Sequence, residues 1–458
     1  MNEMRPRHIV LFIAACLVLL AALCVIKEYA APVLGSLRWP TATGMLPERP
    51  TPPATTTVTL GRLDTTEIPA VQDIQEPLER IDTLVPIGRL DTIKPAPPKP
   101  VVPAHKALDA FIAALAEADT KQVRVVHYGD SQIEEDRITA TLRNNLQSLY
   151  GGGGPGLLPL QQTIPTRTVK QSLYIDDVRV TSKNGPQRYL VYGPKNQQRD
   201  SDAYGPLGQV ALMDTMLRKG SDTIIMQVEP FGKLTSANYF NQIRVLMTDS
   251  IEVNGRSSSI LTLPDSSKEC TLEFTGQGEI YGVSLETKTG IIVDNVPMRG
   301  GSGNVFTKIN ADQLRNFYRA TNTRLIILQF GGNVMPWAES EERVRSYAYS
   351  MRKQIRYLKA CAPDASILFI GPSDMTTVVE GERTSYPMLP YMDEQLARAC
   401  ATEGIAYWSL YQAMGGWNSM MVWQENGLAA SDGVHFMQSG ARKAGNMLWK
   451  WLEKKIEN

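Results

Sequence analysis

An apolar strand and a polar turn adjoin at residues 123–132, whose sequence is VRVVHYGDSQ. The run up to Gly129 has the length and the β-branched content of a buried strand. Helical spacing of apolar residues follows from about Ile133 to Tyr150, so the segment predicts a strand, a turn and a helix. In an open α/β sheet, ligands bind at the carboxyl ends of the strands. The segment therefore predicts an α/β domain with Ser131 at its ligand-binding edge.

The same alternation of strand and helix resumes near residue 290 and continues to the C-terminus. Predicted strands, rich in Ile, Leu and Val, lie at 291–294, 325–329, 367–370 and 405–408. Predicted helices lie among them at about 339–360, 386–403 and 438–455, and a further helix is predicted at about 106–118, before the first strand. This pattern is typical of a parallel sheet that is covered by helices on both faces.

A segment with a different pattern of residues separates the two α/β segments. Short runs rich in β-branched and aromatic residues, such as 223–228 and 271–274, alternate with Gly, Asn, Asp and Pro. This spacing predicts an antiparallel β-sandwich. We therefore expect one α/β domain in two parts, 106–164 and 287–458, interrupted by an all-β insertion at 165–286.

The N-terminal segment, residues 1–29, predicts a cytoplasmic tip and a transmembrane helix. Its apolar run from Ile9 to Ile26 is long enough to cross the hydrocarbon layer at about 1.5 Å per residue. Arg5 and Arg7 precede the run, so we expect a single pass through the cytoplasmic membrane, with the N-terminus inside and the rest periplasmic. The alternative is a cleaved signal peptide, although the KEY tripeptide after the run makes a poor cleavage site.

Residues 30–105 predict a disordered, Pro-rich linker. Its end, KPAPPKP at 94–100, has the composition of an extended polyproline segment. Proline fixes φ and lacks an amide donor, so neither a helix nor a sheet continues through it. The linker separates the expected anchor from the folded part, which we expect to start near Lys106.

Composition argues against several classes of partner and of binding site. The 47 basic and 47 acidic residues cancel, so the chain lacks the charge signature of a nucleic-acid-binding protein. Its five cysteines, two of them in the apolar N-terminal run, show no metal-ligand spacing. We therefore expect no nucleic-acid partner, no disulfide framework and no metal site.

The best candidate for a general base is His435, in the sequence SDGVH at 431–435. Asp432 stands three residues earlier, and on a tight turn its carboxylate can reach the imidazole Nδ1 and leave Nε2 free to take a proton. The alternative is a loop before a helix, in which Asp432 only forms a turn. The other histidine of the folded part, His127, lies inside the first predicted strand.

Ser131 is the candidate nucleophile, because it lies at a strand end and at a helix N-terminus. Free amides there favour the negative charge that develops on an attacked carbonyl oxygen. The alternative is an ordinary N-cap serine. Two further loops can donate to that oxygen: GGSG at 300–303 through backbone amides, and Asn333 of the GGN segment through its side chain. Turn chemistry alone also accounts for each loop.

The order of these motifs resembles the sequence blocks of the SGNH (GDSL-type) hydrolase family, and specifically its peptidoglycan O-acetylesterase-like branch. The resemblance covers about residues 106–160 and 287–458. It implies a flavodoxin-like, three-layer domain with a parallel sheet. It also implies a catalytic triad of Ser131, Asp432 and His435.

The resemblance further implies an oxyanion hole. Its donors would be the backbone amides of Ser131 and Gly300 and the side chain of Asn333, with Gly303 as the second choice of glycine. The sequence departs from the common family motif at Gln132, where leucine usually follows the nucleophile. Because that branch departs there too, the difference argues against a long-chain lipase and not against catalysis.

The activity that the resemblance implies is removal of O-acetyl or other short acyl groups from a polysaccharide, with peptidoglycan as the expected substrate and no cofactor. The inserted β-sandwich is similar in placement to a carbohydrate-binding module, so we expect it to bind glycan. Two alternatives stay open. One is an extracytoplasmic polysaccharide O-acetyltransferase that uses the same triad, and the other is a non-catalytic glycan-binding scaffold.

Overall fold

The computed structural model describes residues 106–457, except 176, 182–183 and 214–222. The predicted anchor at 1–29 and the predicted linker at 30–105 lie outside the described residues. Within the described ranges, no helix is both long enough and apolar enough to span a bilayer.

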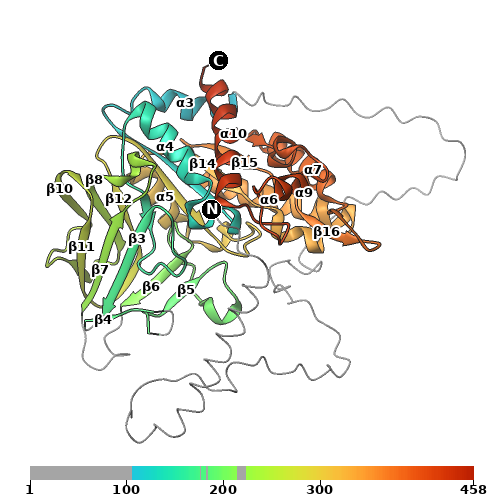
Figure 1. Ribbon diagram of the computed structural model, residues 1–458. Coiled ribbons are helices and arrows are strands. Elements are labelled where there is room, and N and C mark those ends of the chain that lie inside the picture. Colours follow the sequence, from blue (N-terminus) through green and yellow to red (C-terminus); the bar gives the residue numbers. More distant parts are fainter. Residues whose placement is uncertain (1–105, 176, 182–183, 214–222, 458) are drawn as a thin grey trace, which may run out of the picture. The chain divides into compact units, whose positions relative to one another are not determined.

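A five-stranded sheet forms the centre of the α/β domain (Figure 1). Its strand order is β13-β1-β14-β15-β18, and every neighbouring pair is parallel. The strands are β1 (Gln122–Gly129), β13 (Gly290–Pro297), β14 (Thr323–Gln329), β15 (Ser366–Ile370) and β18 (Ala406–Trp408). The predicted parallel sheet is therefore confirmed, and the strand of the VRVVHYGDSQ segment lies inside it.

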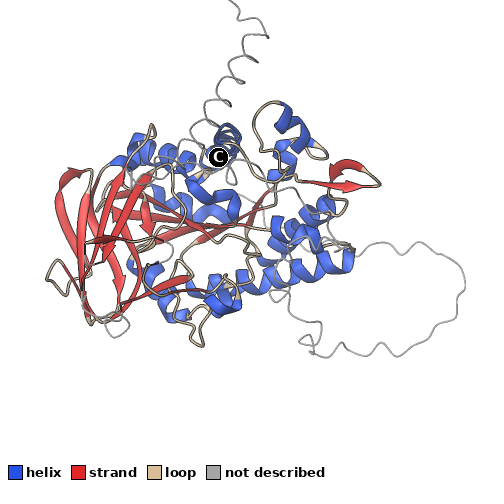
Figure 2. Ribbon diagram, turned by 60° about the horizontal axis from the view of Figure 1, so that its bottom comes forward, coloured by secondary structure: helices blue, strands red, loops and turns tan. Residues whose placement is uncertain are grey.

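Helices cover both faces of this sheet, which gives three layers (Figure 2). Successive residues of β1 point to opposite faces: Val123 and Val125 pack in one apolar layer, and Val126 and Tyr128 in the other. The first layer includes side chains of α3, α4 and α10, and the second includes side chains of α5, α6 and α7. The helices are α3 (Asp109–Leu115), α4 (Thr139–Tyr150), α5 (Ala311–Ala320), α6 (Glu341–Cys361), α7 (Leu389–Glu403) and α10 (Gln438–Ile456).

Shorter elements lie between these helices and strands. They are η3 (Lys106–Leu108), η4 (Ser131–Asp136), η5 (Lys195–Gln197), η7 (Thr235–Asn238), η8 (Phe306–Lys308), η9 (Gly332–Trp337), α8 (Leu410–Met414), α9 (Ser419–Glu425) and the hairpin of β16 (Thr376–Val379) and β17 (Glu382–Ser385). The helix predicted from about Ile133 to Tyr150 is wrong over its first turn. There the chain forms η4, because Glu135 and Asp136 adopt positive φ.

The insertion consists of two antiparallel sheets that share one apolar core. The first has the order β10-β8-β12-β6-β5, and the second has the order β4-β3-β7-β11-β9. The first sheet comprises β5 (Arg188–Leu190), β6 (Gln209–Met213), β8 (Phe240–Met247), β10 (Ile260–Ser267) and β12 (Gly278–Glu286). The second comprises β3 (Val169–Ile175), β4 (Val178–Arg179), β7 (Thr223–Pro230), β9 (Ile251–Val253) and β11 (Cys270–Gly276).

The structure adds one strand that precedes the predicted start of the insertion at residue 165. This strand, β2 (Gly156–Leu158), pairs with β12 of the first sheet. The loop before it requires glycine: a Cβ on Gly152 would lie 2.3 Å from the carbonyl oxygen of Ile291, and one on Gly154 would lie 2.2 Å from that of Leu285. The glycine-rich loop thus packs closely against β12 and β13, where the insertion meets the central sheet.

A buried ion-pair network fastens the insertion to the α/β domain. Arg124 of β1 is fully buried and contacts Asp294 of β13, with 2.7 Å between Nη1 and Oδ1, and Glu286 of β12. Glu286 also accepts from Arg244 of β8. Removing one member of such a network leaves a buried charge unpaired and typically costs about 3–5 kcal/mol. The network therefore fixes the insertion relative to β1, the strand that leads to Ser131.

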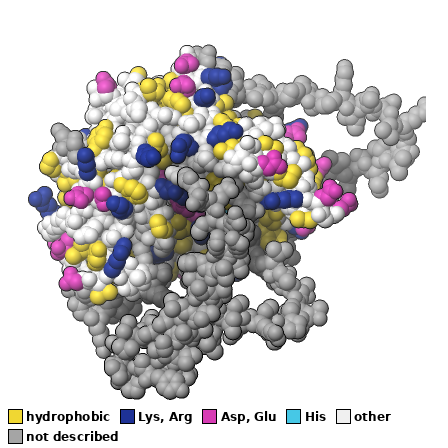
Figure 3. Space-filling view, viewed as in Figure 1, with side chains coloured by type: hydrophobic (Ala, Val, Ile, Leu, Met, Phe, Trp, Pro, Cys, Tyr) yellow, Lys and Arg dark blue, Asp and Glu magenta, His cyan; other side chains and the backbone are white. Residues whose placement is uncertain are grey.

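Surface charge is mixed. On the face seen in Figure 3, Lys and Arg side chains are interspersed with Asp and Glu, as expected for a chain with 47 residues of each sign. The described part of that face has no continuous stripe of positive charge of the kind that attracts nucleic acid.

Candidate active site

Ser131 lies where β1 ends and η4 begins. Asp130 caps η4, because its Oδ1 accepts a hydrogen bond from the Gln132 amide at 2.9 Å. Burial raises the pKa of the Asp130 carboxyl to about 6, although the Gln132 hydrogen bond acts in the opposite direction. The Ser131 Oγ is 2.9 Å from Nε2 of His435, which is hydrogen-bond distance.

The other half of the site is a tight turn at residues 432–435. Asp432 Oδ1 accepts the backbone amides of Val434 at 2.9 Å and His435 at 3.0 Å, and Gly433 takes a positive φ of 71°. The second carboxylate oxygen, Oδ2, lies 2.7 Å from Nδ1 of His435. The structure therefore aligns Ser131, His435 and Asp432 in one hydrogen-bonded chain.

The charge of Asp432 determines which way this chain can move a proton. Burial by itself would raise the pKa of the Asp432 carboxyl, but hydrogen bonds from the His435 side chain and amide and from the Val434 amide outweigh it and lower that pKa. The ionised carboxylate favours a proton on Nδ1 of His435, which leaves the Nε2 lone pair facing the Ser131 hydroxyl. The arrangement can therefore accept the serine proton.

Gly300 and Asn333 line the same surface depression as the three aligned residues, a hollow of about 550 Å³. Asn333 follows β14, and its Nδ2 donates to the carbonyl oxygen of Gly301 at 3.1 Å, which ties the two loops together. A primary amide has a second N–H, so one donor of Asn333 is left for a ligand. Gly303, the second choice of glycine, packs instead on the ring of Phe330.

The sequence did not predict that Gln132 contributes to the site. Its side-chain Nε2 donates to the carbonyl oxygen of Val434 at 2.6 Å and to Ser373 Oγ at 3.1 Å. The residue after Ser131 thus holds the residue before His435. A polar side chain where related motifs have leucine was the available signal, but its partner is 302 positions away in the sequence.

The segment after Ser131 is strained and externally braced. Glu135 and Asp136 have φ of 58° and 62°, a region that costs a non-glycine residue about 1–3 kcal/mol. Buried Asp136 pairs with Arg143 of α4 and accepts from Thr168 Oγ1 of the insertion at 2.7 Å. Arg167, also from the insertion, contacts Glu135 at 3.0 Å. Because the insertion supplies two of these partners, it helps to shape the wall of the depression.

Asp374, which follows β15, and His127, in β1, have other hydrogen-bond partners. Asp374 is buried and accepts from Ser385 Oγ at 2.6 Å and the Met420 amide at 2.7 Å, so it holds the β17 and α9 loops. His127 is buried between Thr139 and Gln329, and burial lowers its pKa to about 3. Among the described residues, no group of three or more His, Cys, Asp or Glu side chains is placed to hold a metal ion.

Comparison with known proteins gives a match at the level of structure. No protein-family model matches the sequence. No curated protein matches it either. A solved structure described as a peptidoglycan O-acetylesterase in action is 21% identical, covers 78% of this chain and 96% of that chain, and superposes with a TM-score of 0.58.

Smaller matches cover about a third of the chain. A carbohydrate acetylesterase from Sinorhizobium meliloti is 11% identical, with a TM-score of 0.26, and covers 36% of this chain and 79% of that chain. The periplasmic domain of a lipopolysaccharide acetyltransferase from Salmonella ser. Paratyphi A is 14% identical, with a TM-score of 0.26, and covers 36% of this chain and 74% of that chain. Of these three structures, the peptidoglycan O-acetylesterase is similar enough to define the architecture. Its alignment covers 78% of this chain, more than the two α/β segments contain, so it includes the insertion. The chain therefore shares its fold, the α/β domain together with the inserted β-domain, with a solved peptidoglycan O-acetylesterase.

Proposed function

We propose that the protein is a serine esterase that removes O-acetyl groups from a polysaccharide, with peptidoglycan as the expected substrate. The observation that carries this proposal is the chain of hydrogen bonds from Ser131 through His435 to Asp432, at 2.9 and 2.7 Å. Nucleophile, base and orienting carboxylate in this order are the constellation of serine acyl transfer. The shared fold with a peptidoglycan O-acetylesterase supports the choice of ester.

The reaction would proceed in two acyl-transfer steps. Ser131 Oγ attacks the acetyl carbonyl carbon while His435 Nε2 takes the hydroxyl proton. The protonated imidazole, steadied by Asp432, then gives that proton to the sugar oxygen as the C–O bond breaks. Acetyl-Ser131 remains. A water molecule attacks this ester while His435 Nε2 takes one of its protons, and the imidazolium gives that proton to Ser131 Oγ as acetate leaves.

The negative oxygen of each tetrahedral intermediate needs donors. The backbone N–H groups of Ser131 and Gly300 and the second N–H of Asn333 are the proposed set. A Cβ built on Gly300 would meet no atom within 4 Å, so its backbone borders open space where a substrate can approach. Preorganised donors of this kind stabilise charge that appears only in the transition state.

Hydrolysis is favoured over acetyl transfer by the openness of the site. The His435 side chain keeps 35% of its surface exposed and the Asp432 side chain 49%, so water can approach the acetyl-enzyme. A transferase would need to hold a sugar hydroxyl there and keep water out. Adding an unacetylated glycan acceptor should therefore leave acetate release unchanged; formation of acetylated acceptor at the expense of acetate would favour transfer.

The test of the proposed function is acetate release by the purified full-length protein. O-acetylated peptidoglycan, acetylated xylan and a small aryl acetate should be compared, each with the wild type, Ser131→Ala and the exposed control Ser201→Ala. We expect release by the wild type and by Ser201→Ala only, and fastest release from peptidoglycan. A wild type that releases acetate from none of the three would contradict the proposal.

We also propose that residues 1–29 anchor the enzyme in the cytoplasmic membrane, with the catalytic part periplasmic. The apolar run from Ile9 to Ile26, preceded by Arg5 and Arg7, supports this topology. A C-terminal fusion to alkaline phosphatase, which folds only outside the cytoplasm, should be active and membrane-bound. An inactive phosphatase fusion beside an active cytoplasmic reporter at the same position would reverse the topology.

A further inference from the structure

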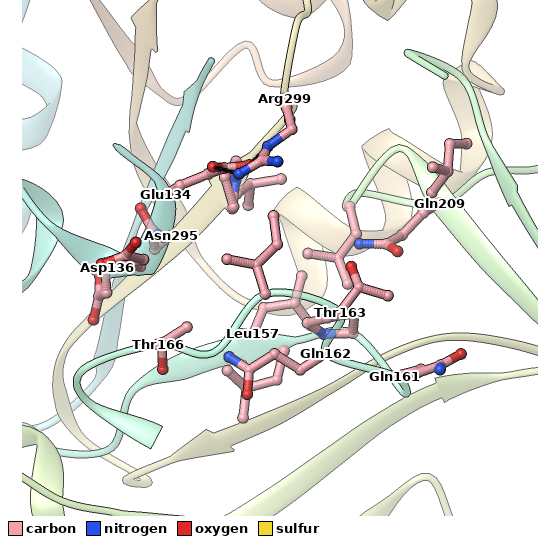
Figure 4. Close-up of a pocket in the computed structure, with 18 of the residues that line it drawn as sticks. Glu134, Asp136, Leu157, Gln161, Gln162, Thr163, Thr166, Gln209, Asn295 and Arg299 are labelled. Carbon is pink, nitrogen blue, oxygen red and sulfur yellow. Dashed lines mark hydrogen bonds and ion pairs between the residues drawn. The ribbon is translucent and has the colours of Figure 1, made fainter. Parts of the chain in front are cut away.

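A second hollow adjoins the depression that contains Ser131. It has a volume of about 470 Å³ and lies between the insertion and the α/β domain. The two hollows share three lining residues, Glu134, Glu135 and Arg299. In Figure 4, the Glu134–Arg299 pair, Asn295 and Asp136 lie on one side of the second hollow. A polymer that is held by an ester at Ser131 can therefore continue into this cleft.

The opposite side of the cleft belongs to the insertion and is rich in uncharged hydrogen-bonding groups. Gln161, Gln162, Thr163 and Gln209 lie along that side in Figure 4. Apolar side chains such as Leu157 lie among them. Amides and hydroxyls around an apolar floor suit a ligand that presents both hydroxyls and ring faces, as sugars do.

The three arginines that line the cleft differ in their partners. Arg143 is paired with Asp136, and Arg299 holds both carboxylate oxygens of Glu134 at 2.6 and 2.7 Å. Arg188 of β5 has no carboxylate at ion-pair distance among the described residues. Its hydrogen bond there is a long one, 3.5 Å, from Nη1 to Gln209 Oε1. Arg188 is therefore the cation of this cleft that can accept an anionic partner.

The surroundings of Arg188 make such a partner favourable. Its side chain is half-buried, and burial lowers its pKa because water is withdrawn from the guanidinium without a carboxylate to replace it. A ligand carboxylate would restore that lost stabilisation. The planar guanidinium matches a carboxylate with two parallel hydrogen bonds.

We propose that this cleft binds the part of the polymer next to the reacting sugar, and that Arg188 pairs with a carboxylate on it. The inference rests on the proposed function, because an esterified chain at Ser131 is what enters the cleft. It assigns the substrate class as an acidic polysaccharide. The carboxylate can belong to a sugar ring, as in a uronic acid, or to a peptide attached to the sugar.

The kinetic test compares Arg188→Met, which keeps an apolar stem, with Arg188→Lys and with Arg256→Gln, an exposed arginine of the insertion outside the cleft. The substrates are O-acetylated muropeptides, the same muropeptides with amidated peptide carboxylates, acetylated oligogalacturonate, acetylated xylo-oligosaccharide and an aryl acetate. Loss of a charged hydrogen-bonded pair predicts a rise of about tenfold to a hundredfold in KM. We expect it for Arg188→Met on acidic substrates only, with partial recovery in Arg188→Lys.

The substrate that is affected identifies the source of the carboxylate. A rise confined to unmodified muropeptides indicates a peptide carboxylate, and a rise confined to oligogalacturonate indicates a ring carboxylate. Equal KM changes on acidic and neutral substrates, or no change on any, would overturn the proposal.

Binding to Ser131→Ala gives a readout that does not depend on turnover. Calorimetric titration with unacetylated muropeptides and oligogalacturonate should show an affinity for one of them that Arg188→Met weakens and added salt weakens further. Absence of any Arg188-dependent binding would overturn the inference even if wild-type esterase activity is present. Arg188-dependent binding without esterase activity would retain the cleft and contradict the proposed function alone.

Discussion

Ser131 and His435 lie 2.9 Å apart, from Oγ to Nε2, yet different kinds of contact hold them in place. The turn around His435 is local: Asp432 receives its hydrogen bonds from residues two and three positions away. The segment around Ser131 depends on distant groups. Its brace Asp136 meets Arg143 and Thr168, and the latter belongs to the inserted domain.

The difference indicates a division of labour between the two parts of the fold. His435 and Asp432, the proposed base and its carboxylate, contact each other within one short segment. The position of Ser131, the proposed nucleophile, relative to them depends on the central sheet, on Gln132 and on the insertion. Damage to the local turn should therefore affect chemistry with little loss of stability, whereas damage to the braces should affect both.

Loss of turnover should separate most clearly from loss of stability in Asp432→Asn. The asparagine oxygen can still accept the amides of the turn, but its NH₂ group would face Nδ1 and favour the wrong imidazole tautomer. We expect kcat to fall by roughly 10⁴ with little change in the melting temperature. Turnover of the aryl acetate and thermal unfolding measure the two quantities, with the exposed Asp249→Asn as the matched control. A kcat within about tenfold of the wild-type value would show that Asp432 has no role in the reaction.

A smaller loss of turnover is expected for Asn333→Ala. Removal of one oxyanion donor typically lowers kcat by about 10²–10³, and KM should change little because the charge develops after binding. The same substitution breaks the hydrogen bond to Gly301, so the melting temperature must be measured as well. A higher KM with unchanged kcat would assign Asn333 to substrate binding instead.

Gln132→Leu tests the contact that joins the two halves of the triad. Leucine fills a similar volume but cannot donate to the Val434 carbonyl. A displacement of the base by about 1 Å can cost up to roughly 10² in rate, so we expect a loss of about ten- to a hundredfold in kcat. Labelling of Ser131 by a serine-directed fluorophosphonate should slow by a similar factor. Unchanged labelling would show that the histidine turn holds its position without Gln132.

The smallest effect is expected at the brace from the insertion. Thr168→Val removes the hydrogen bond to the buried Asp136 carboxylate and keeps the side-chain shape. The free energy of unfolding should fall by about 1.5–3 kcal/mol, the usual value for a hydrogen bond to a charged group. Denaturant unfolding measures it, with the exposed Thr262→Val of β10 as the control. Equal stability of both variants would mean that the insertion does not brace the nucleophile segment.

The same contrast explains what the sequence could and could not predict. Periodicity predicted the four strands after residue 287, the long helices α6, α7 and α10, and the parallel sheet. It did not predict α5, the short helices α8 and α9, or the hairpin of β16 and β17. The contact between Asp432 and His435 was predictable because the hydrogen bonds of Asp432 join it to residues two and three positions away.

Features that depend on residues far apart in the sequence could not be predicted from it. The helical periodicity after Ser131 concealed the positive φ of Glu135 and Asp136, because their braces come from other elements. Strand β2 has three residues in a glycine-rich segment, too few to show a strand period. The cleft around Arg188 required knowledge of which face of the insertion meets the α/β domain.

In the proposed mechanism, Ser131 carries the acyl group during turnover. Intact-protein mass spectrometry of rapidly quenched reactions with an aryl acetate tests it most directly. We expect a transient increase by the mass of one acetyl group, which peptide mapping should locate on Ser131. The increase should last longer in variants that slow deacylation and be absent from Ser131→Ala. Acetate release at the wild-type rate by Ser131→Ala, or an acetyl group found on another residue, would contradict it.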